Sequence, residues 1–219
     1  MQIRGLGTLK LNSTKEYVNK YITEFYQVDM FYRRTLEAYH ELLTKENPIE
    51  LVLNAAKRQL DLEYAKIANL LNLEWLTCVE EKGTWFTETG LKHQEDFYAN
   101  ESDPNVKQVV IISDALRYEV AMELMQRLAK EKHMATIEAY QAMLPTETKF
   151  CKPSLLPHHS LELFGTDMAV DGVVLTTTEQ RTAHLNKYRD GGICVRYEDV
   201  MNGDQTSTRE LFKRPLVYI

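Results

Sequence analysis

The stretch Val-Val-Ile-Ile-Ser-Asp-Ala-Leu-Arg-Tyr-Glu, residues 109–119, passes from a short apolar run into the beginning of a helix. Residues 106–112 are apolar and rich in β-branched side chains, which is typical of a strand covered on both faces of a sheet. Residues 119–132 then carry apolar side chains at helical spacing. Asp114 comes where the strand ends, and open α/β sheets bind ligands at the carboxyl ends of their strands. This order predicts an α/β fold with a ligand site near Asp114.

The same alternation of short apolar runs and helical patterns continues to the last residue. Further strands are expected at 135–140, 172–175, 193–197 and 215–219, and further helices at 178–188 and 207–213. Strands that alternate with helices form βαβ units, which produce a mostly parallel sheet with flanking helices.

The first hundred residues have a helical pattern instead. Ser13 and Glu16 have the spacing of a capping box, and an aromatic stripe at helical spacing follows over residues 17–39. Asn47-Pro48 has the residue types that open a helix, which predicts a second helix over residues 51–70 that packs antiparallel to the first. The aromatic stripe is expected to be core. Because residues 101–105 are rich in turn formers, we predict an α-helical region at 1–103 and an α/β domain at 104–219.

Composition excludes several classes of protein. The chain has 219 residues and a net charge of −6, so direct nucleic-acid binding is not indicated, and no apolar run is long enough to cross a membrane. The three cysteines are far apart, which favours reduced thiols and a cytoplasmic protein. The last apolar strand has no polar tail, which suggests a piece of a longer protein.

A second motif, Met-Leu-Pro-Thr-Glu-Thr-Lys-Phe at 143–150, offers hydroxyl groups just after a Leu-Pro turn. A threonine hydroxyl can attack phosphorus when a base or a metal ion lowers its pKa, and an acid such as Asp114 can coordinate the metal. Thr148 and Thr146 are both candidates for the nucleophile. Taken alone, the residue patterns favour simpler roles: a helix cap for Asp114 and a turn for the threonines.

Four nearby residues could support such a site. Arg117 and Glu119 can pair with each other or hold the loop after Asp114. His158 can contribute a ligand or lie in a surface loop, as can its neighbour His159, and His184 is expected to face solvent from its helix.

Together the two motifs, followed by Leu-Leu-Pro-His at 155–158, resemble the PglZ family of bacterial phage-defence systems of the BREX (Pgl) type. That family has a core related to the alkaline phosphatase superfamily. The resemblance is strongest over residues 107–158. It implies a metal-dependent phosphatase or phosphodiesterase, with other defence-system proteins as partners. Asp114 would be a metal ligand, and Thr148 would be both the nucleophile and a metal ligand, with Thr146 as the second candidate.

The resemblance also sets the expected surroundings of the site and its limits. Arg117, Glu119, Thr146 and His158 are expected near the substrate or the ligands, and the cation would be Zn²⁺, Mn²⁺ or Mg²⁺. Cys151-Lys152-Pro153 replaces a Gly-Met-like stretch of the family, and the further Asp and His ligands of the superfamily would follow residue 219. The chain is therefore expected to be inactive alone. A non-catalytic component of a defence complex is the alternative, and a receiver-like module fits the helical prefix poorly.

Overall fold

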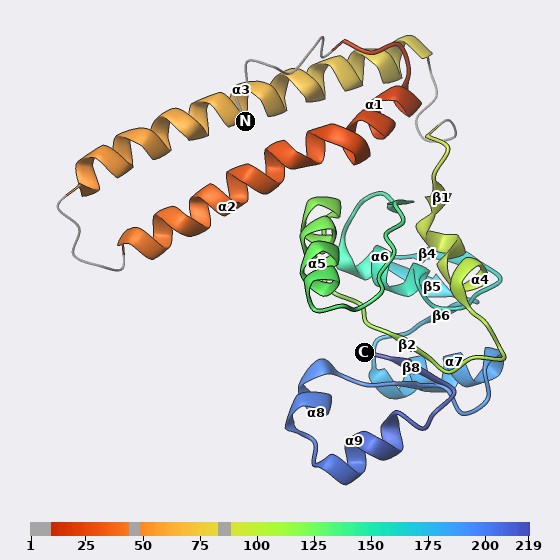
Figure 1. The fold of residues 1–219 in the computed structure, drawn as a ribbon. Coiled ribbons are helices and arrows are strands. Elements are labelled where there is room, and N and C mark those ends of the chain that lie inside the picture. The colour runs from red at the N-terminus through yellow and green to blue at the C-terminus, as the bar shows by residue number, and fades with distance from the viewer. Residues whose placement is uncertain (1–9, 44–48, 83–88) are drawn as a thin grey trace. The chain divides into compact units, whose positions relative to one another are not determined.

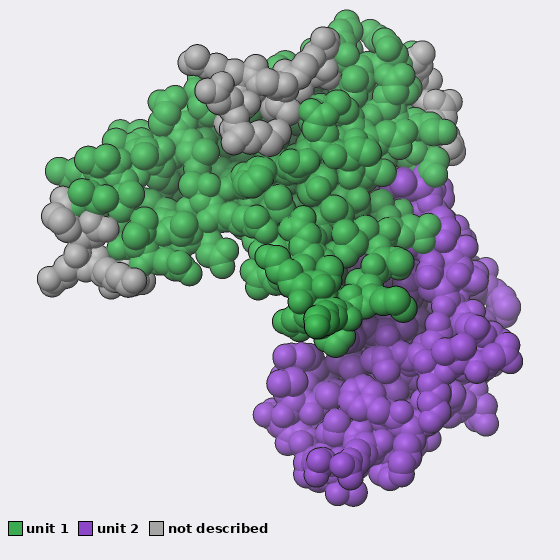
Figure 2. Space-filling model, in the orientation of Figure 1, with its two compact units in different colours: residues 1–90, 116–139 green, residues 91–115, 140–219 purple. Residues whose placement is uncertain are grey.

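The computed structural model describes residues 10–43, 49–82 and 89–219. The chain divides into two compact units, coloured separately in Figure 2. The helical unit consists of Met1–Gly90 and Leu116–Ala139, and the α/β unit consists of Leu91–Ala115 and Tyr140–Ile219. The predicted boundary between a helical region at 1–103 and an α/β domain at 104–219 stays a prediction, because a division into compact units does not by itself define domains.

Four helices and one π-helical turn make up the described part of the helical unit. They are α1 (Thr14–Lys20), the turn η2 (Tyr21–Phe25), α2 (Tyr26–Leu43), α3 (Glu50–Lys82) and α5 (Tyr118–Lys130). The Ser13 hydroxyl accepts a hydrogen bond from the Glu16 N–H, as its capping-box spacing predicted. The first predicted helix is interrupted by η2, and the second continues to Lys82. Asn47-Pro48 lies outside the described residues.

Helices α2 and α3 pack antiparallel, as predicted (Figure 1). The contacts run in opposite directions along the two helices: the Tyr39 hydroxyl bonds to Asn54, while the Tyr32 ring stacks on Tyr64 with centroids 3.8 Å apart. In the aromatic stripe Tyr17 and Phe25 are buried, whereas Tyr21, Tyr32 and Tyr39 are half-buried. Burying such side chains supplies most of the stability of a helix pair in water.

The α/β unit is built on a parallel three-stranded sheet in the order β2-β8-β7. The strands are β2 (Gln108–Val110), β7 (Ile193–Cys194) and β8 (Leu216–Tyr218), and helix α7 (Thr178–Tyr188) packs on β7. All three residues of the central strand β8 are buried. A parallel central strand reads as an unbroken apolar run because both of its faces are covered. The predicted α/β fold with a parallel sheet and flanking helices is confirmed.

An antiparallel sheet of β4 (Leu161–Phe164), β5 (Asp167–Val170) and β6 (Val173–Val174) corrects one expectation. The segment 172–175 was expected to join the parallel sheet, but β6 turns back on β5. Asp171 and Gly172 both have positive φ, 48° and 78°, which is the geometry of a tight two-residue hairpin turn. The Asp-Gly pair is a hairpin signal that outweighs the βαβ pattern around it.

The predicted strand at 135–140 is also largely wrong. Only β3 (Tyr140–Gln141) forms there, and it pairs in parallel with β1 (Lys92–His93). Residues 135 and 136 are exposed, so the run lacks the covered face that stabilises a strand. Five short helical elements complete the described α/β unit: η3 (Gln94–Asp96), α4 (Phe97–Glu101), α6 (Thr148–Ser154), α8 (Tyr197–Asn202) and α9 (Gln205–Leu211). Within the described ranges, no helix combines the length and apolar character needed to cross a membrane.

Candidate functional site

Asp114 and Thr148 lie together in the α/β unit although they are 34 residues apart in sequence. The Thr148 hydroxyl donates a hydrogen bond to Asp114 Oδ1 at 3.3 Å, and both side chains are exposed. Asp114 follows β2, whose ladder to β8 continues as far as the bond from the Ile112 N–H to the Ile219 carbonyl. The carboxylate therefore lies just beyond the carboxyl end of the sheet. It does not cap α5, whose N-cap residue is Arg117.

Thr148 is the first residue of helix α6 (Thr148–Ser154). This helix is fixed by Gln94, which sequence reasoning missed. The Gln94 side-chain amide donates to the Cys151 carbonyl at 2.8 Å and accepts from the Met143 N–H at 3.2 Å. Gln94 thus bridges both sides of the Pro-Thr-Glu-Thr turn. No local pattern around residue 94 signals a contact with residues 49 and 57 positions later.

Thr146 and the thiol of Cys151, which lies in α6, are less well suited than Thr148 to act as the nucleophile. Thr146 is exposed, and its side chain has no hydrogen-bond partner among the residues that the structure describes. The pKa of the Cys151 thiol is raised by burial, and the nearby charge of Asp114 raises it further against a hydrogen bond from Gln94. A thiol with a raised pKa stays protonated at neutral pH, so it is a poor nucleophile.

Arg117 and Glu119 belong to the helical unit, where Glu119 is fully buried. Arg117 is 3.7 Å from Glu119, as the sequence suggested, but the stronger partner is Arg33. Arg33 Nε lies 3.1 Å from both carboxylate oxygens of Glu119, and Arg33 Nη2 bonds to Oε2 at 2.8 Å. Bonds from Arg33 and then from Arg127 hold the pKa of the neighbouring Glu123 at about 2. The Glu119 carboxylate is therefore engaged inside the helical unit.

The two histidines of interest make contacts with the backbone. His158 Nδ1 is 2.7 Å from the Leu156 carbonyl, and the structure does not place its ring against Asp114 or Thr148 in the part of the chain that it describes. His184 is buried, with Nε2 2.7 Å from the Pro157 carbonyl, so the expectation that it faces solvent was wrong. The reason is that its side of α7 packs into the core beside Leu185.

Asp171 ties the β5–β6 turn to the loop before β4. Its carboxylate accepts the N–H groups of His159 at 2.7 Å and Ser160 at 2.9 Å, and the Tyr188 hydroxyl bonds to its other oxygen. Burial acts to raise the pKa of Asp171, but the bond from Tyr188, the two backbone bonds and the nearby His184 together lower it to about 2. The carboxylate thus joins three segments of the α/β unit.

We expect Asp171 to make the stability of the protein depend on pH. Because its pKa falls from 3.8 to about 2 on folding, the ionised carboxylate stabilises the fold above about pH 4, and this contribution is lost as the pH falls toward 2. Urea unfolding of the Asp171→Asn variant measures this contribution to stability. Asparagine tolerates the positive φ at this position. The free-energy gap to the parent chain should be full at pH 5 and nearly closed at pH 2. A gap that does not change with pH would contradict this role.

The donor chemistry at Asp114 and Thr148 suits a divalent cation only in part. A carboxylate oxygen and a hydroxyl oxygen are ligands that hard cations accept. However, the described residues contain no group of three or more His, Cys, Asp or Glu side chains that could hold a metal ion. Three or more protein ligands are usual in metal sites. These two residues therefore supply two oxygen ligands and not a complete metal site.

Comparison with known proteins identifies the relatives of this chain. Residues 96–219, more than half of the chain, match the family described as "BREX system PglZ alkaline phosphatase-like domain". The alkaline phosphatase-like protein PglZ of Bacillus cereus (strain H3081.97) is 28% identical over 200 residues, which are 88% of this chain and 23% of that protein. The alkaline phosphatase-like protein BrxZ of Escherichia coli O9:H4 (strain HS) is 32% identical over 142 residues, 59% of this chain and 16% of that protein. No solved structure matches. The chain thus spans less than a quarter of the length of these relatives.

Proposed function

The chain belongs to the family of BREX system PglZ alkaline phosphatase-like domains, and from this we propose that it forms part of a metal-dependent phosphatase or phosphodiesterase of a bacterial phage-defence system. Thr148 is the proposed nucleophile and Asp114 its partner. The observation that supports this assignment is the 3.3 Å bond between the two side chains at the carboxyl end of the sheet. That edge is where α/β sheets bind their ligands.

In the proposed reaction, the Thr148 hydroxyl loses its proton to solvent and its oxygen attacks phosphorus, which forms an O–P bond while the bond from phosphorus to the leaving oxygen breaks. The leaving oxygen takes a proton from solvent and departs as an alcohol. Water then hydrolyses the phosphothreonine and releases phosphate or a phosphomonoester. Asp114 orients the hydroxyl by accepting its hydrogen bond. A divalent cation, when bound, would lower the pKa of the hydroxyl and offset the charge of the phosphoryl group. Asp114 and Thr148 would be two of its ligands.

The residues around Asp114 and Thr148 have different proposed roles. Gln94 holds the turn that presents Thr148. Arg117, Glu119, Thr146 and His158 remain candidates for the surroundings of the substrate, and Glu119 already has a structural partner in Arg33. We further propose other proteins of the defence system as partners and the cytoplasm as the location. The free state of all three cysteines supports a reducing compartment.

Replacing Asp114 with asparagine tests this function. The variant keeps the size of the side chain but removes its charge, so metal-stimulated hydrolysis of a chromogenic phosphodiester by the complete protein should fall at least about a hundredfold. Asp190→Asn, at an exposed acid in the turn after α7, is the matched control and should keep the parent rate. The assignment fails if both variants hydrolyse the diester equally well.

A non-catalytic role in assembling the defence complex is the second candidate. It is favoured by the lack of a three-ligand cluster among residues 10–43, 49–82 and 89–219. Phage plaque assays separate the two functions. If the protein only assembles the complex, Asp114→Asn should protect cells as well as the parent does, whereas deletion of the gene should abolish protection. If the protein is a hydrolase, the substitution and the deletion should have the same effect.

A further inference from the structure

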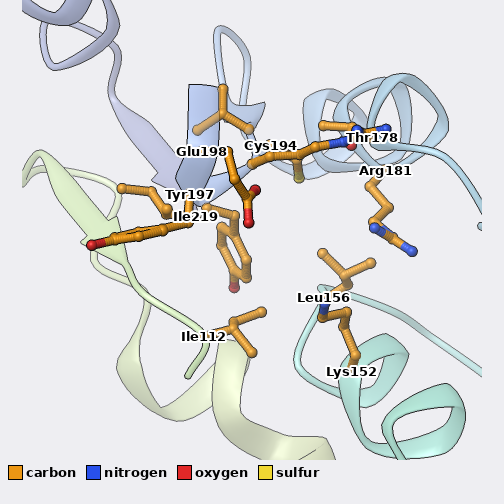
Figure 3. A pocket seen from close by; sticks show the side chains of 12 residues that line it. Ile112, Lys152, Leu156, Thr178, Arg181, Cys194, Tyr197, Glu198 and Ile219 are labelled. Atoms are coloured by element: carbon orange, nitrogen blue, oxygen red, sulfur yellow. The ribbon is translucent and has the colours of Figure 1, made fainter. Parts of the chain in front are cut away.

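A pocket of about 250 Å³ lies in the α/β unit at the carboxyl ends of the parallel strands (Figure 3). Ile112 comes two residues after β2, Arg196 two residues after β7, and Tyr218 is the last residue of β8; all three line the pocket. The volume is slightly below the ~300 Å³ at which pockets for drug-sized ligands begin. The pocket therefore suits one small group, such as a phosphate, rather than a whole nucleotide.

The charge of the lining is positive. Lys152, Arg181 and Arg196 line the pocket, and Glu198 is the single acid among the lining side chains. Within the part of the chain that the structure describes, none of the three cations forms an ion pair with a carboxylate. The Arg181 guanidinium donates a hydrogen bond to the Thr176 carbonyl at 3.3 Å. Lys152 and Arg181 are half-buried and Arg196 is exposed, and cations that form no ion pair leave donors available for an anion.

Glu198 is the acidic side chain of the lining, so its charge acts on a bound anion in the opposite direction to the charges of the three cations. Figure 3 shows Arg181 at the right of the pocket and the Glu198 carboxylate nearer its centre, with Ile112 and Lys152 on the side opposite Cys194. The net charge of the lining is +2, from three cations and one acid. An anion that enters the pocket would gain attraction from the cations and repulsion from Glu198. Removing each kind of charge should therefore change anion affinity in opposite directions.

The pocket shares two segments with the pair Asp114–Thr148. Ile112 precedes Asp114 by two residues on the segment after β2, and Lys152 follows Thr148 by four residues on α6. Four helical residues correspond to a rise of about 6 Å. A ligand whose reacting phosphorus is at Thr148 can therefore reach the pocket with a second group of modest length.

We infer that this pocket binds a second, non-reacting phosphate group of the substrate, held by Arg181, Arg196 and Lys152. This inference rests on the proposed function for the reacting phosphate, and it narrows the substrate to esters with at least two phosphate groups. Two guanidinium groups and one ammonium group match the charge and the several acceptor oxygens of a phosphate. A nucleoside diphosphate and a single-stranded oligonucleotide both provide this chemistry.

Calorimetric titration of the complete protein with pyrophosphate, in the presence of EDTA, tests the pocket without any turnover. Arg181→Gln and Arg196→Gln should each weaken binding about tenfold, because each removes a charged hydrogen-bond donor. Glu198→Gln should tighten binding about threefold, because it removes the one repulsive charge. Arg209→Gln, at an exposed arginine on α9 outside the pocket, should leave the affinity unchanged. Arg196 is exposed, so its variant serves even if Arg181→Gln fails to fold.

Equal losses in Arg181→Gln and Arg209→Gln, or an affinity that Glu198→Gln leaves unchanged or weakens, would overturn the inference. Titration with ADP and with a 5′-phosphorylated trinucleotide then identifies the source of the second phosphate by which of them binds more tightly. Both should lose affinity with Arg181→Gln. The titration measures binding alone, because it does not depend on hydrolysis. A failed hydrolysis assay would thus count against the proposed function, and a failed titration against the pocket alone.

Discussion

Replacing Arg33 with alanine is expected to destabilise the helical unit by about 3 kcal/mol, because it leaves the Glu119 carboxylate buried without its main partner. Glu119 is fully buried, and it accepts three hydrogen bonds from Arg33. The same guanidinium also bonds to Glu123. Removing one partner of a buried pair costs about 3–5 kcal/mol, and the lower value applies because the Arg33 side chain is 31% exposed. Urea unfolding followed by ellipticity at 222 nm measures the loss.

Two further variants show whether the stability loss in Arg33→Ala comes from the buried charge of Glu119 or from the loss of an arginine contact. Arg34→Ala removes a more exposed arginine that contacts Glu123 at 3.3 Å, and it should cost less than about 1 kcal/mol. Adding Glu119→Gln to Arg33→Ala removes the buried charge that has lost its main partner, so it should restore part of the lost stability. If Arg33→Ala costs no more than Arg34→Ala, Glu119 must find solvent or another partner when Arg33 is absent.

Much of the α/β unit could be predicted because its signals are local. Helix 178–188 has the predicted bounds, since Thr177 and Gln180 form a capping box at its start. The parallel strands at 193–197 and 215–219 were found from their apolar runs, although the paired parts are shorter. Strands β4 and β5 were missed, and β6, which lies within the predicted strand at 172–175, was assigned to the parallel sheet although it pairs with β5. The Asp171-Gly172 pair carried the missing signal.

The residues of the candidate site also differ in whether a local sequence signal could predict them. Asp114 and Thr148 could be proposed from sequence because each belongs to a motif, and motif order implied that they meet. Gln94 and Arg33 could not, because each acts through a contact with a residue 49 or more positions away. Periodicity reports which face of a helix is apolar, but it does not report which polar side chain lies opposite. Glu119 is an example: its motif suggested a place near the substrate, but the sequence did not show that its carboxylate is paired with Arg33.

Replacing Thr148 with alanine should reduce hydrolysis of a phosphodiester by the complete protein at least about a thousandfold, because it removes the proposed attacking oxygen. Thr148→Ser keeps a hydroxyl at the same position and should stay within about tenfold of the parent rate. The steady-state rate and the amount of phosphoenzyme trapped by acid quench are the two measurements. The alanine variant should form no phosphoenzyme, whereas the serine variant should form a phosphoserine.

Thr146→Ala decides between the two threonines of the turn. Thr146 is exposed and makes no side-chain hydrogen bond with any described residue, whereas Thr148 donates to Asp114, so only Thr148 has its oxygen held beside a carboxylate. The Thr146→Ala variant should therefore retain most of the parent rate and should still form phosphoenzyme. If Thr146→Ala abolishes the phosphoenzyme and Thr148→Ala does not, the roles are reversed. The bond to Asp114 would then mark a metal ligand or a positioning residue rather than the nucleophile.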